Sequence, residues 1–279
     1  MVLAACTACC ALTVNFSQRI AMFSLSNPAV TYMLYCLQQR VCVEATNAVP
    51  SMAESQVQHD RLLSAAVLAA TGGLLDAVVY TLHGHVFANA MTGNVILLGI
   101  SAFSQDWLQA MRHLVPICCF IAGVVASRYL RILPQFYASI AVLALEMLVL
   151  FAAGLLSLSF PEMAFTAIIA FTSAFQVSTF RQVGRFAYNS TFITGNLRTA
   201  SEALVNQFLE RESELRHSEA AKARKLFLIC GFFLVGAIAG AAGAPHLGNQ
   251  TLWLAEPLLL VALGRVLYLK TDAGIPSPE

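Results

Sequence analysis

Charge is what this sequence has least of. Only 11% of its 279 residues are Asp, Glu, Lys or Arg, whereas 58% are hydrophobic. A soluble domain of ordinary composition carries about 25% charged and about 45–50% apolar residues. The deficit therefore excludes an ordinary soluble fold, and the apolar runs are long enough for transmembrane helices, which need about 20 residues. We expect an all-α, polytopic transmembrane helical bundle, with the lipid bilayer as its main partner.

The sequence also lacks the short motifs of common enzymes. It holds no Gly-x-Ser-x-Gly, no His-Glu-x-x-His, no phosphate-binding loop and no dinucleotide fingerprint. We therefore expect no enzyme activity and no cofactor; the alternative is an intramembrane enzyme that uses Asp76, Glu146 or His83. The formal net charge of +1, without a basic run that contains aromatics, predicts no nucleic-acid partner.

A cysteine framework is missing as well. Cys118, Cys119 and Cys230 lie in apolar runs, where cysteine behaves as a small hydrophobic residue. The other cysteines fall in the first 42 residues, and no second cluster of ligands accompanies them. The pattern predicts neither disulfide bonds nor a metal site.

Residues 1–60 differ from the rest of the chain, because they contain no acidic residue before Glu44 and few bases. They have neither the charged start of a secretory signal nor the arginine content of a transit peptide. We interpret them as a poorly ordered extension, with Met52 as an alternative start of the working protein. The membrane domain then covers 61–270, followed by a short polar tail at 271–279.

The tripeptide Thr-Gly-Asn occurs twice, at residues 92–94 and 194–196, each time between apolar stretches. The surroundings of the two copies correspond, with a polar residue before each copy and a glutamate in the last apolar run after it. A repeat of fixed length indicates that one structural unit is present twice. We place the two units at 61–158 and 159–270.

The apolar runs predict six spans, three in each unit. They lie at 62–82, 113–132, 137–158, 161–180, 225–243 and 252–269. If the Thr-Gly-Asn segments 86–103 and 190–207 do not cross, nearly every Lys and Arg lies on one side, as the positive-inside rule requires. We therefore expect two partial segments beside six full spans, with both termini in the cytoplasm; eight crossings are the alternative.

Three crossings per unit would insert the second unit upside down relative to the first. The two Thr-Gly-Asn segments would then enter the bilayer from opposite sides. Inverted repeats with interrupted helices that meet near the bilayer midplane are a recurrent design of transporters.

The residues of Thr-Gly-Asn suit the start of a helix. The Thr hydroxyl can cap the helix N-terminus, and Gly permits a turn or close packing. Free backbone N–H groups at such a terminus favour an anion or a carbonyl oxygen. Alternatively, Gly packs against a neighbouring span and Asn satisfies the backbone of the interrupted segment.

Several polar residues lie within the apolar runs. Asp76 has two possible roles: it binds a proton or cation, or it bonds to open backbone nearby. Gln176 occupies the equivalent place in the second unit. Glu146 and Glu256, at matched places, either bond to the interrupted segment of their own unit, line a cavity or join helices by hydrogen bonds.

Two further features flank the Thr-Gly-Asn segments. His83 and His85 stand on either side of Gly84; we interpret them as a solvated interfacial pair, the alternatives being metal binding or pH sensing. Arg198 follows the second copy within one turn, close enough to pair with an anion or with Glu202.

Parts of the sequence resemble the YoaK-like membrane proteins, a family defined by a domain of unknown function. These parts are Gly73-Leu74-Leu75-Asp76, Ala90-Met91-Thr92-Gly93-Asn94 and the second Thr194-Gly195-Asn196. The resemblance covers about residues 60–270. It implies a polytopic membrane protein of about six spans, with no established substrate or site. This chain departs from the pattern by placing Gln176 where an acid would mirror Asp76.

We expect a small-solute transporter or permease; the alternative is a membrane binding or scaffold protein without transport. A small solute or ion is the expected ligand, and a homo-oligomer is compatible with the sequence. The residues expected to bind the substrate are Asp76, Thr92, Gly93, Asn94, Gln176, Thr194, Gly195, Asn196 and Arg198, with Glu146 and Glu256 in support.

Overall fold

The computed structural model describes residues 52–180, 182–183, 186–187 and 193–272. Most of the expected N-terminal extension and of the polar tail lies outside these residues. By their internal contacts, Met1–Ser55 and Gln56–Glu279 form two separate units, and the description below concerns the second.

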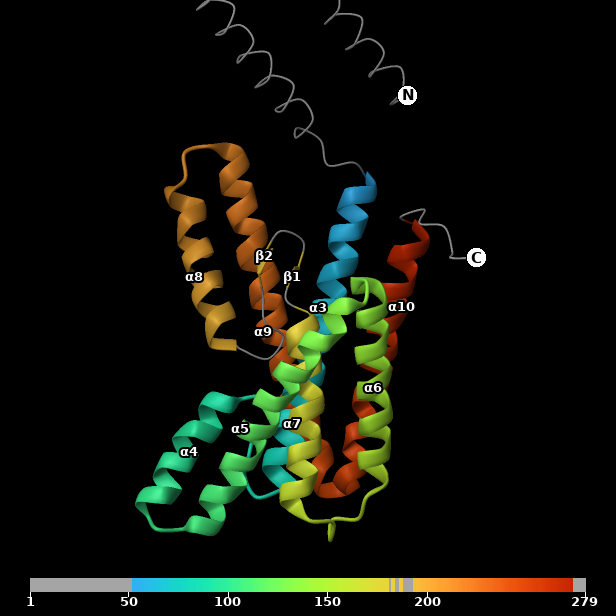
Figure 1. Ribbon diagram of the computed structural model, residues 1–279. Coiled ribbons are helices and arrows are strands. Elements are labelled where there is room, and N and C mark those ends of the chain that lie inside the picture. The colour runs from blue at the N-terminus through green and yellow to red at the C-terminus, as the bar shows by residue number, and fades with distance from the viewer. Residues whose placement is uncertain (1–51, 181, 184–185, 188–192, 273–279) are drawn as a thin grey trace, which may run out of the picture. The chain divides into compact units, whose positions relative to one another are not determined.

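The described chain is helical apart from one pair of two-residue strands (Figure 1). The helices are α3 (Met52–Leu82), α4 (Met91–Phe103), α5 (Trp107–Ser127), α6 (Gln135–Leu155), α7 (Glu162–Thr179), α8 (Ile193–Leu209), α9 (Ser213–Leu247) and α10 (Glu256–Asp272), with the 3-10 helices η1 (Arg128–Ile132) and η2 (Gly248–Ala255). Strands β1 (Gln182–Val183) and β2 (Phe186–Ala187) pair antiparallel, with Gln182 opposite Ala187. The expected all-helical class is confirmed.

Four stretches of the described chain are long and apolar enough to cross a membrane. They are Leu62–Leu82, Trp107–Leu130, Gln135–Leu155 and the 56-residue stretch Ser213–Tyr268. The last comprises α9, η2 and most of α10, so the span expected at 252–269 is not one regular helix. It begins as a 3-10 helix, and its α-helix starts only at Glu256.

The core of this unit is built around α3. Its residues are apolar on nearly all sides, which is typical of a helix enclosed by others. Leu68, Leu75 and Val79 are buried in one cluster with Leu143 of α6 and Leu259 of α10. A second, smaller cluster joins the other side of α3 to α8 and α9.

Glycines allow two pairs of helices to approach closely. A Cβ on Gly236 of α9 would overlap the carbonyl oxygen of Ala70 in α3, and one on Gly240 would lie 2.6 Å from that of Leu74. A Cβ on Gly123 of α5 would lie 2.5 Å from the carbonyl oxygen of Phe171 in α7. Such contacts between small residues and backbone are typical of helix packing in membranes.

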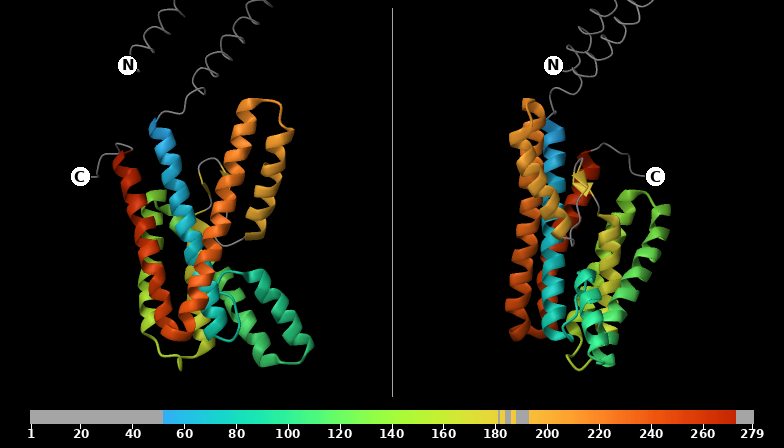
Figure 2. Two further views of the ribbon diagram at one scale, coloured as in Figure 1. Left: turned by 180° about the vertical axis from the view of Figure 1, so that it is seen from behind. Right: turned by 90° about the vertical axis from the view of Figure 1, so that its left-hand side faces the viewer.

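The helices that carry the two Thr-Gly-Asn copies run in opposite directions. In Figure 1 the loop between α4 and α5 lies at the bottom of the drawing, whereas the loop between α8 and α9 lies at the top. Each of the two helices packs against the one that follows it in the chain. The view from behind in Figure 2 shows the same opposition.

Candidate functional site

The first Thr-Gly-Asn opens a helix inside the unit, beside the buried carboxyl group of Asp76. After α3 ends, residues 83–90 turn back, and α4 then starts. Oδ1 of Asp76 accepts hydrogen bonds from the backbone N–H groups of Asn89 and Ala90, at 2.7 and 3.4 Å. The start of α4 therefore lies level with Asp76, well before the end of α3. The carboxylate of Asp76 accepts hydrogen bonds at the start of this helix, where we expected a bound anion to do so.

Two acceptor oxygens remain unused at this point. Oδ2 of Asp76 and Oδ1 of Asn89 are buried and have no hydrogen-bond partner in the described part of the chain. Nδ2 of Asn89 donates to the carbonyl oxygen of Gly72 at 3.4 Å, so the asparagine joins the returning segment to α3. A buried acceptor without a donor is costly, and it suits a proton, a cation or a solute that donates hydrogen bonds.

Asn94 holds the backbone of the returning segment. Its Oδ1 accepts from the N–H of Phe87 at 2.9 Å, and its Nδ2 donates to the carbonyl oxygen of the same residue at 2.8 Å. The amide therefore replaces the backbone partners that Phe87 lost where the helix is broken. Of the two roles considered for this Asn, the structure contains the one in which it satisfies the interrupted backbone.

Thr92 and Gly93 differ in their surroundings. The N-cap of α4 is Ala90, no side chain caps the helix, and Thr92 is exposed, so the expected Thr cap is wrong for this copy. Ala90 occupies the cap because the turn closes on its carbonyl oxygen, which accepts from Gly93 N at 2.9 Å. A Cβ on Gly93 would lie 2.8 Å from the ring of Phe87, so this glycine permits close packing.

The second copy repeats the pattern of burial. Thr194 and Gly195 are exposed in the first turn of α8, and Asn196 is buried. On α7, Gln176 is fully buried, and neither Oε1 nor Nε2 has a hydrogen-bond partner among the described residues. A Cβ on Gly195 would meet no atom of the described residues within 4 Å. The two copies thus share a buried Asn beneath exposed neighbours.

Arg198 does not lie with the buried residues. Its side chain is 79% exposed, and Nε donates to Oε1 of Glu202 at 2.8 Å on the surface of α8. Of the two partners considered for this arginine, the structure contains Glu202. An exposed pair of this kind contributes little to stability.

Glu146 is buried within α6 and makes no hydrogen bond. It is 1% exposed, and neither carboxyl oxygen has a partner in the described part of the chain. Of the roles considered for this glutamate, neither a bond to the interrupted segment of its own unit nor a hydrogen bond between helices is present among the described residues. Glu146 instead lies within electrostatic range of Glu256, whose Oε1 is also buried and unpartnered.

His83 is a buried structural contact at the end of α3, so the expectation of a solvated pair is wrong for this residue. It is 1% exposed, its ring stacks on Phe165 at 3.8 Å between centroids, and Nε2 lies 2.8 Å from Oδ1 of Asn249. Burial lowers the pKa of His83, while Asn249 and nearby Glu162 oppose that shift. His85, by contrast, is exposed.

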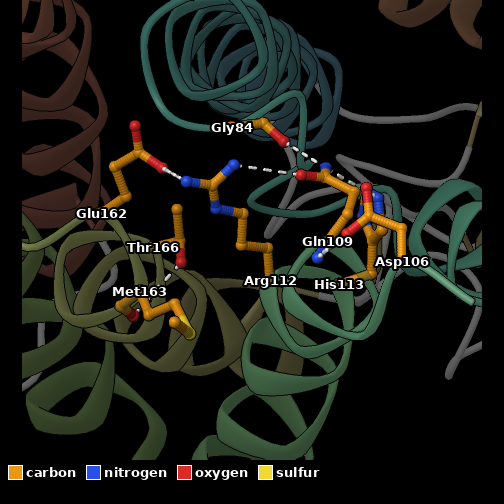
Figure 3. Close-up of polar contacts among 8 residues, drawn as sticks. All are labelled: Gly84, Asp106, Gln109, Arg112, His113, Glu162, Met163 and Thr166. Atoms are coloured by element: carbon orange, nitrogen blue, oxygen red, sulfur yellow. Dashed lines mark hydrogen bonds and ion pairs between the residues drawn. The ribbon is translucent and has the colours of Figure 1, made fainter. Parts of the chain in front are cut away.

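A second polar network lies near His83 and joins α5 to α7 (Figure 3). Arg112 stands between its two partners, with Nη2 at 3.0 Å from Oε2 of Glu162 and Nη1 at 3.1 Å from Oε1 of Gln109. Nε2 of Gln109 in turn donates to the carbonyl oxygen of Gly84 at 2.7 Å. The network fixes the turn after α3 to the start of α5 and of α7.

Asn249 continues these contacts to α6 and borders an open cavity. Its Nδ2 donates to the carbonyl oxygen of Leu156 at 3.0 Å. The cavity has a volume of about 550 Å³ and is lined by Leu82 and by residues 154–158 and 244–250. Among the described residues, no group of three His, Cys, Asp or Glu side chains could hold a metal ion.

Sequence reasoning missed Asn89 and Asn249. Both stand next to small or turn-forming residues in otherwise apolar surroundings, and this signal could have marked them as groups that satisfy broken backbone. It could not have named their partners, because those lie on other elements, such as Leu156 for Asn249.

Long apolar helices that enclose polar side chains define an integral membrane protein that crosses the bilayer several times. The chain belongs to the DUF1275 family of proteins of unknown function, whose family model matches residues 64–264. This confirms the resemblance found in the sequence. The chain is similar to the UPF0700 transmembrane protein YoaK of Bacillus subtilis (strain 168), with 26% identity over 206 residues, which are 70% of this chain and 88% of that protein. No solved structure matches the chain.

Proposed function

We propose that this protein is a carrier for a small polar solute or cation. The observation that supports it most is the interior start of α4 beside Asp76, together with the opposite direction of α8. Irregular backbone at membrane depth is tolerated where protein buries it or where it lines a cavity. Two interrupted segments that enter from opposite sides are the arrangement by which many carriers build a central binding site.

In this proposal six spans and two partial segments make up two inverted units. The spans are α3, α5, α6, α7, α9 and η2 with α10, and the partial segments contain α4 and α8. The close contacts support the pairing, because α5 packs by Gly123 on α7, and α9 packs by Gly236 on α3. In each case the second full span of one unit packs on the first span of the other.

The buried groups without partners suggest what the solute offers. Oδ2 of Asp76 and Oδ1 of Asn89 are acceptors, and Gln176 adds both an acceptor and a donor. A solute that donates hydrogen bonds, or a cation, satisfies these acceptors better than an anion does. We place the two acceptors on the path and leave Asn94 in a supporting role, because both ends of its amide are already engaged.

Orientation follows from the positive charges. The 3-10 helix η1, which contains Arg128 and Arg131, and the start of α9, which carries basic residues, belong to the end that also holds the loop between α8 and α9. Arg112 lies at the opposite end and is paired with Glu162. By the positive-inside rule the first of these ends, with both termini, faces the cytoplasm.

The decisive experiment replaces Gln176 by Met. Because the side chain of Gln176 bonds to no described residue, its replacement by an apolar residue of similar length removes no hydrogen bond seen in the described part of the chain. We expect Gln176→Met to melt at the same temperature as the wild type or higher, and to lose uptake of a radiolabelled solute into sealed vesicles. Wild-type flux no greater than in protein-free vesicles, across a panel of amines, amides and monovalent cations, would count against a carrier. Wild-type flux in Gln176→Met would remove Gln176 from the path.

The second candidate is a membrane scaffold without transport. The two hydrogen bonds between the amide of Asn94 and the backbone of Phe87 favour it. In that case the polar residues only repair the broken backbone. Vesicles that contain the wild-type protein would then be no more permeable than protein-free vesicles, and no solute would raise the melting temperature.

A further inference from the structure

The last apolar stretch changes its helical form where it passes α6. α10 begins at Glu256, directly after the eight residues of η2, and both elements pack against α6. A stretch of 3-10 helix of this length is uncommon and often marks a functional position. Figures 1 and 2 show α6 and α10 side by side.

Two contacts fix how η2 is aligned with α6. Nδ2 of Asn249 donates to the carbonyl oxygen of Leu156 at 3.0 Å, and Nε1 of Trp253 donates to that of Phe151 at 3.2 Å. The chains are thus antiparallel. From Trp253 to Glu256 a 3-10 helix rises about 6 Å, and from Phe151 back to Glu146 an α-helix spans about 7.5 Å. Glu256 therefore lies level with Glu146, in agreement with their electrostatic interaction.

The indole of Trp253 also rests on Gly154, where a Cβ would overlap the ring. This contact holds η2 against α6 and keeps the alignment in place. Glu146 lies near the middle of the 21-residue helix α6, so the two glutamates come level with each other far from either end of that helix.

Among the described elements that pack around this pair, no basic side chain is placed to neutralise it. α6 and η2 carry no Lys or Arg, and the charged residue at the start of α7, Glu162, is paired with Arg112. Arg265 lies nine residues after Glu256 along α10, which is about 13 Å of helix. On α3, the carboxyl group of Asp76 bonds to backbone instead.

We propose that Glu146 and Glu256 form a proton-binding pair in the interior of the membrane domain. Glu146 is 1% exposed with both oxygens unpartnered, and Oε1 of Glu256 is buried without a partner as well. Two ionised carboxylates at one level of the domain interior, one of them fully buried and neither with a cation, would be strongly unfavourable, so at least one of them holds a proton. Their protonation steps belong to the pair rather than to either residue.

The use of this pair for coupling rests on the proposed carrier function, since a carrier that binds and releases this proton would use a proton gradient. The proton site itself does not depend on transport. Its test is therefore spectroscopic, and a negative flux result would leave it intact.

Infrared spectroscopy of the full chain in a detergent without ester groups distinguishes the C=O stretch of a protonated carboxyl group from the bands of a carboxylate. At neutral pH the exposed carboxyl groups are ionised and do not contribute to that C=O band. We expect the wild type to show the band at neutral pH and Glu146→Gln to lose most of it, with a smaller loss in Glu256→Gln. Glu162→Gln, at a carboxylate paired with Arg112, is the matched control and should leave the band unchanged.

Asp76→Asn is measured in parallel, so that the contribution of that buried carboxyl group is known. An unchanged band in both Glu146→Gln and Glu256→Gln overturns the proposal. A wild-type band that appears only after sodium and potassium are removed also overturns it, in favour of a bound cation. If Glu146→Gln does not fold, Glu256→Gln and the wild-type spectrum still decide, because absence of the band from the wild type at neutral pH contradicts a proton-binding pair.

Discussion

At the scale of single residues, we expect the amide of Asn94 to contribute more to the stability of the fold than the exposed Thr92 of the same tripeptide. Asn94→Ala leaves the backbone N–H and C=O of Phe87 without partners. We expect it to lower the free energy of unfolding by about 2–4 kcal/mol. Thr92→Ala, two residues earlier on the exposed side of the same turn, should cost less than about 0.5 kcal/mol. Denaturation of both variants in detergent measures the difference, and equal losses would contradict this role.

His83 should make stability depend on pH. Burial holds its pKa in the folded state below the ordinary value of 6.5, so the unfolded chain binds the proton more readily. The stability that His83 contributes is therefore complete above about pH 6.5 and is lost as pH falls from that value toward the lower pKa of the folded state. Melting curves between about pH 5 and pH 8 should show a weaker slope in His83→Gln than in the wild type.

The control for this measurement is His85→Gln, because His85 is exposed although it lies only two residues away. It should keep the slope of the wild type. A wild-type slope in His83→Gln would mean that another group causes the pH dependence.

The sequence predicted the polar residues better than it predicted their partners. Of the two roles considered for Asp76, the structure contains the bond to open backbone nearby, because residues 83–90 fold back beside α3. The burial of His83 could not be read in the same way, since the ring that covers it, Phe165, belongs to another helix. A histidine at the end of an apolar run has the same sequence pattern whether it faces water or another helix.

At the scale of elements, the contact between α3 and α9 depends on missing side chains. Gly236→Ala would place a methyl group on the backbone of Ala70, and the two helices must separate to accept it. We expect a loss of about 1–3 kcal/mol and a lower melting temperature. Gly231→Ala, on the same helix, meets no described atom within 4 Å and should be neutral or slightly stabilising. If the two variants melted alike, close packing at Gly236 would not be what holds α9.

The bounds of the helices also show where sequence patterns are insufficient. The runs at 62–82 and 137–158 were predicted well because each is one apolar helix between polar ends. The run at 252–269 was predicted as regular although its first part is η2, because apolar residues such as Leu252 and Trp253 fit either helical form. The choice between those forms is made by the contacts of Asn249 and Trp253 with α6, which composition does not reveal.

At the scale of the whole molecule, the opposite directions of α4 and α8 predict a topology. A single cysteine at exposed Ser104, between α4 and α5, should react with a membrane-impermeant maleimide on one side of the membrane. A single cysteine at exposed Glu210, between α8 and α9, should react on the other side. Each is introduced into a chain whose native cysteines are replaced, and labelling of intact and opened vesicles is compared.

Reaction of both cysteines from the same side would contradict the inverted arrangement of the two units and would remove the main support for a carrier. A control cysteine at exposed Tyr129, in η1, should share the side of Glu210.

The enclosed position of α3 has a consequence for how the protein is made. In its apolar window 78% of the residues are buried, against 28% for α5, so α3 has little surface left for lipid. The backbone of Ala70 meets its partner Gly236 only after more than half of the polypeptide has followed. During synthesis α3 is therefore held in the insertion machinery or in lipid before α9 can pack against it. A chain cut short before α9 would thus leave the side of α3 around Ala70 uncovered.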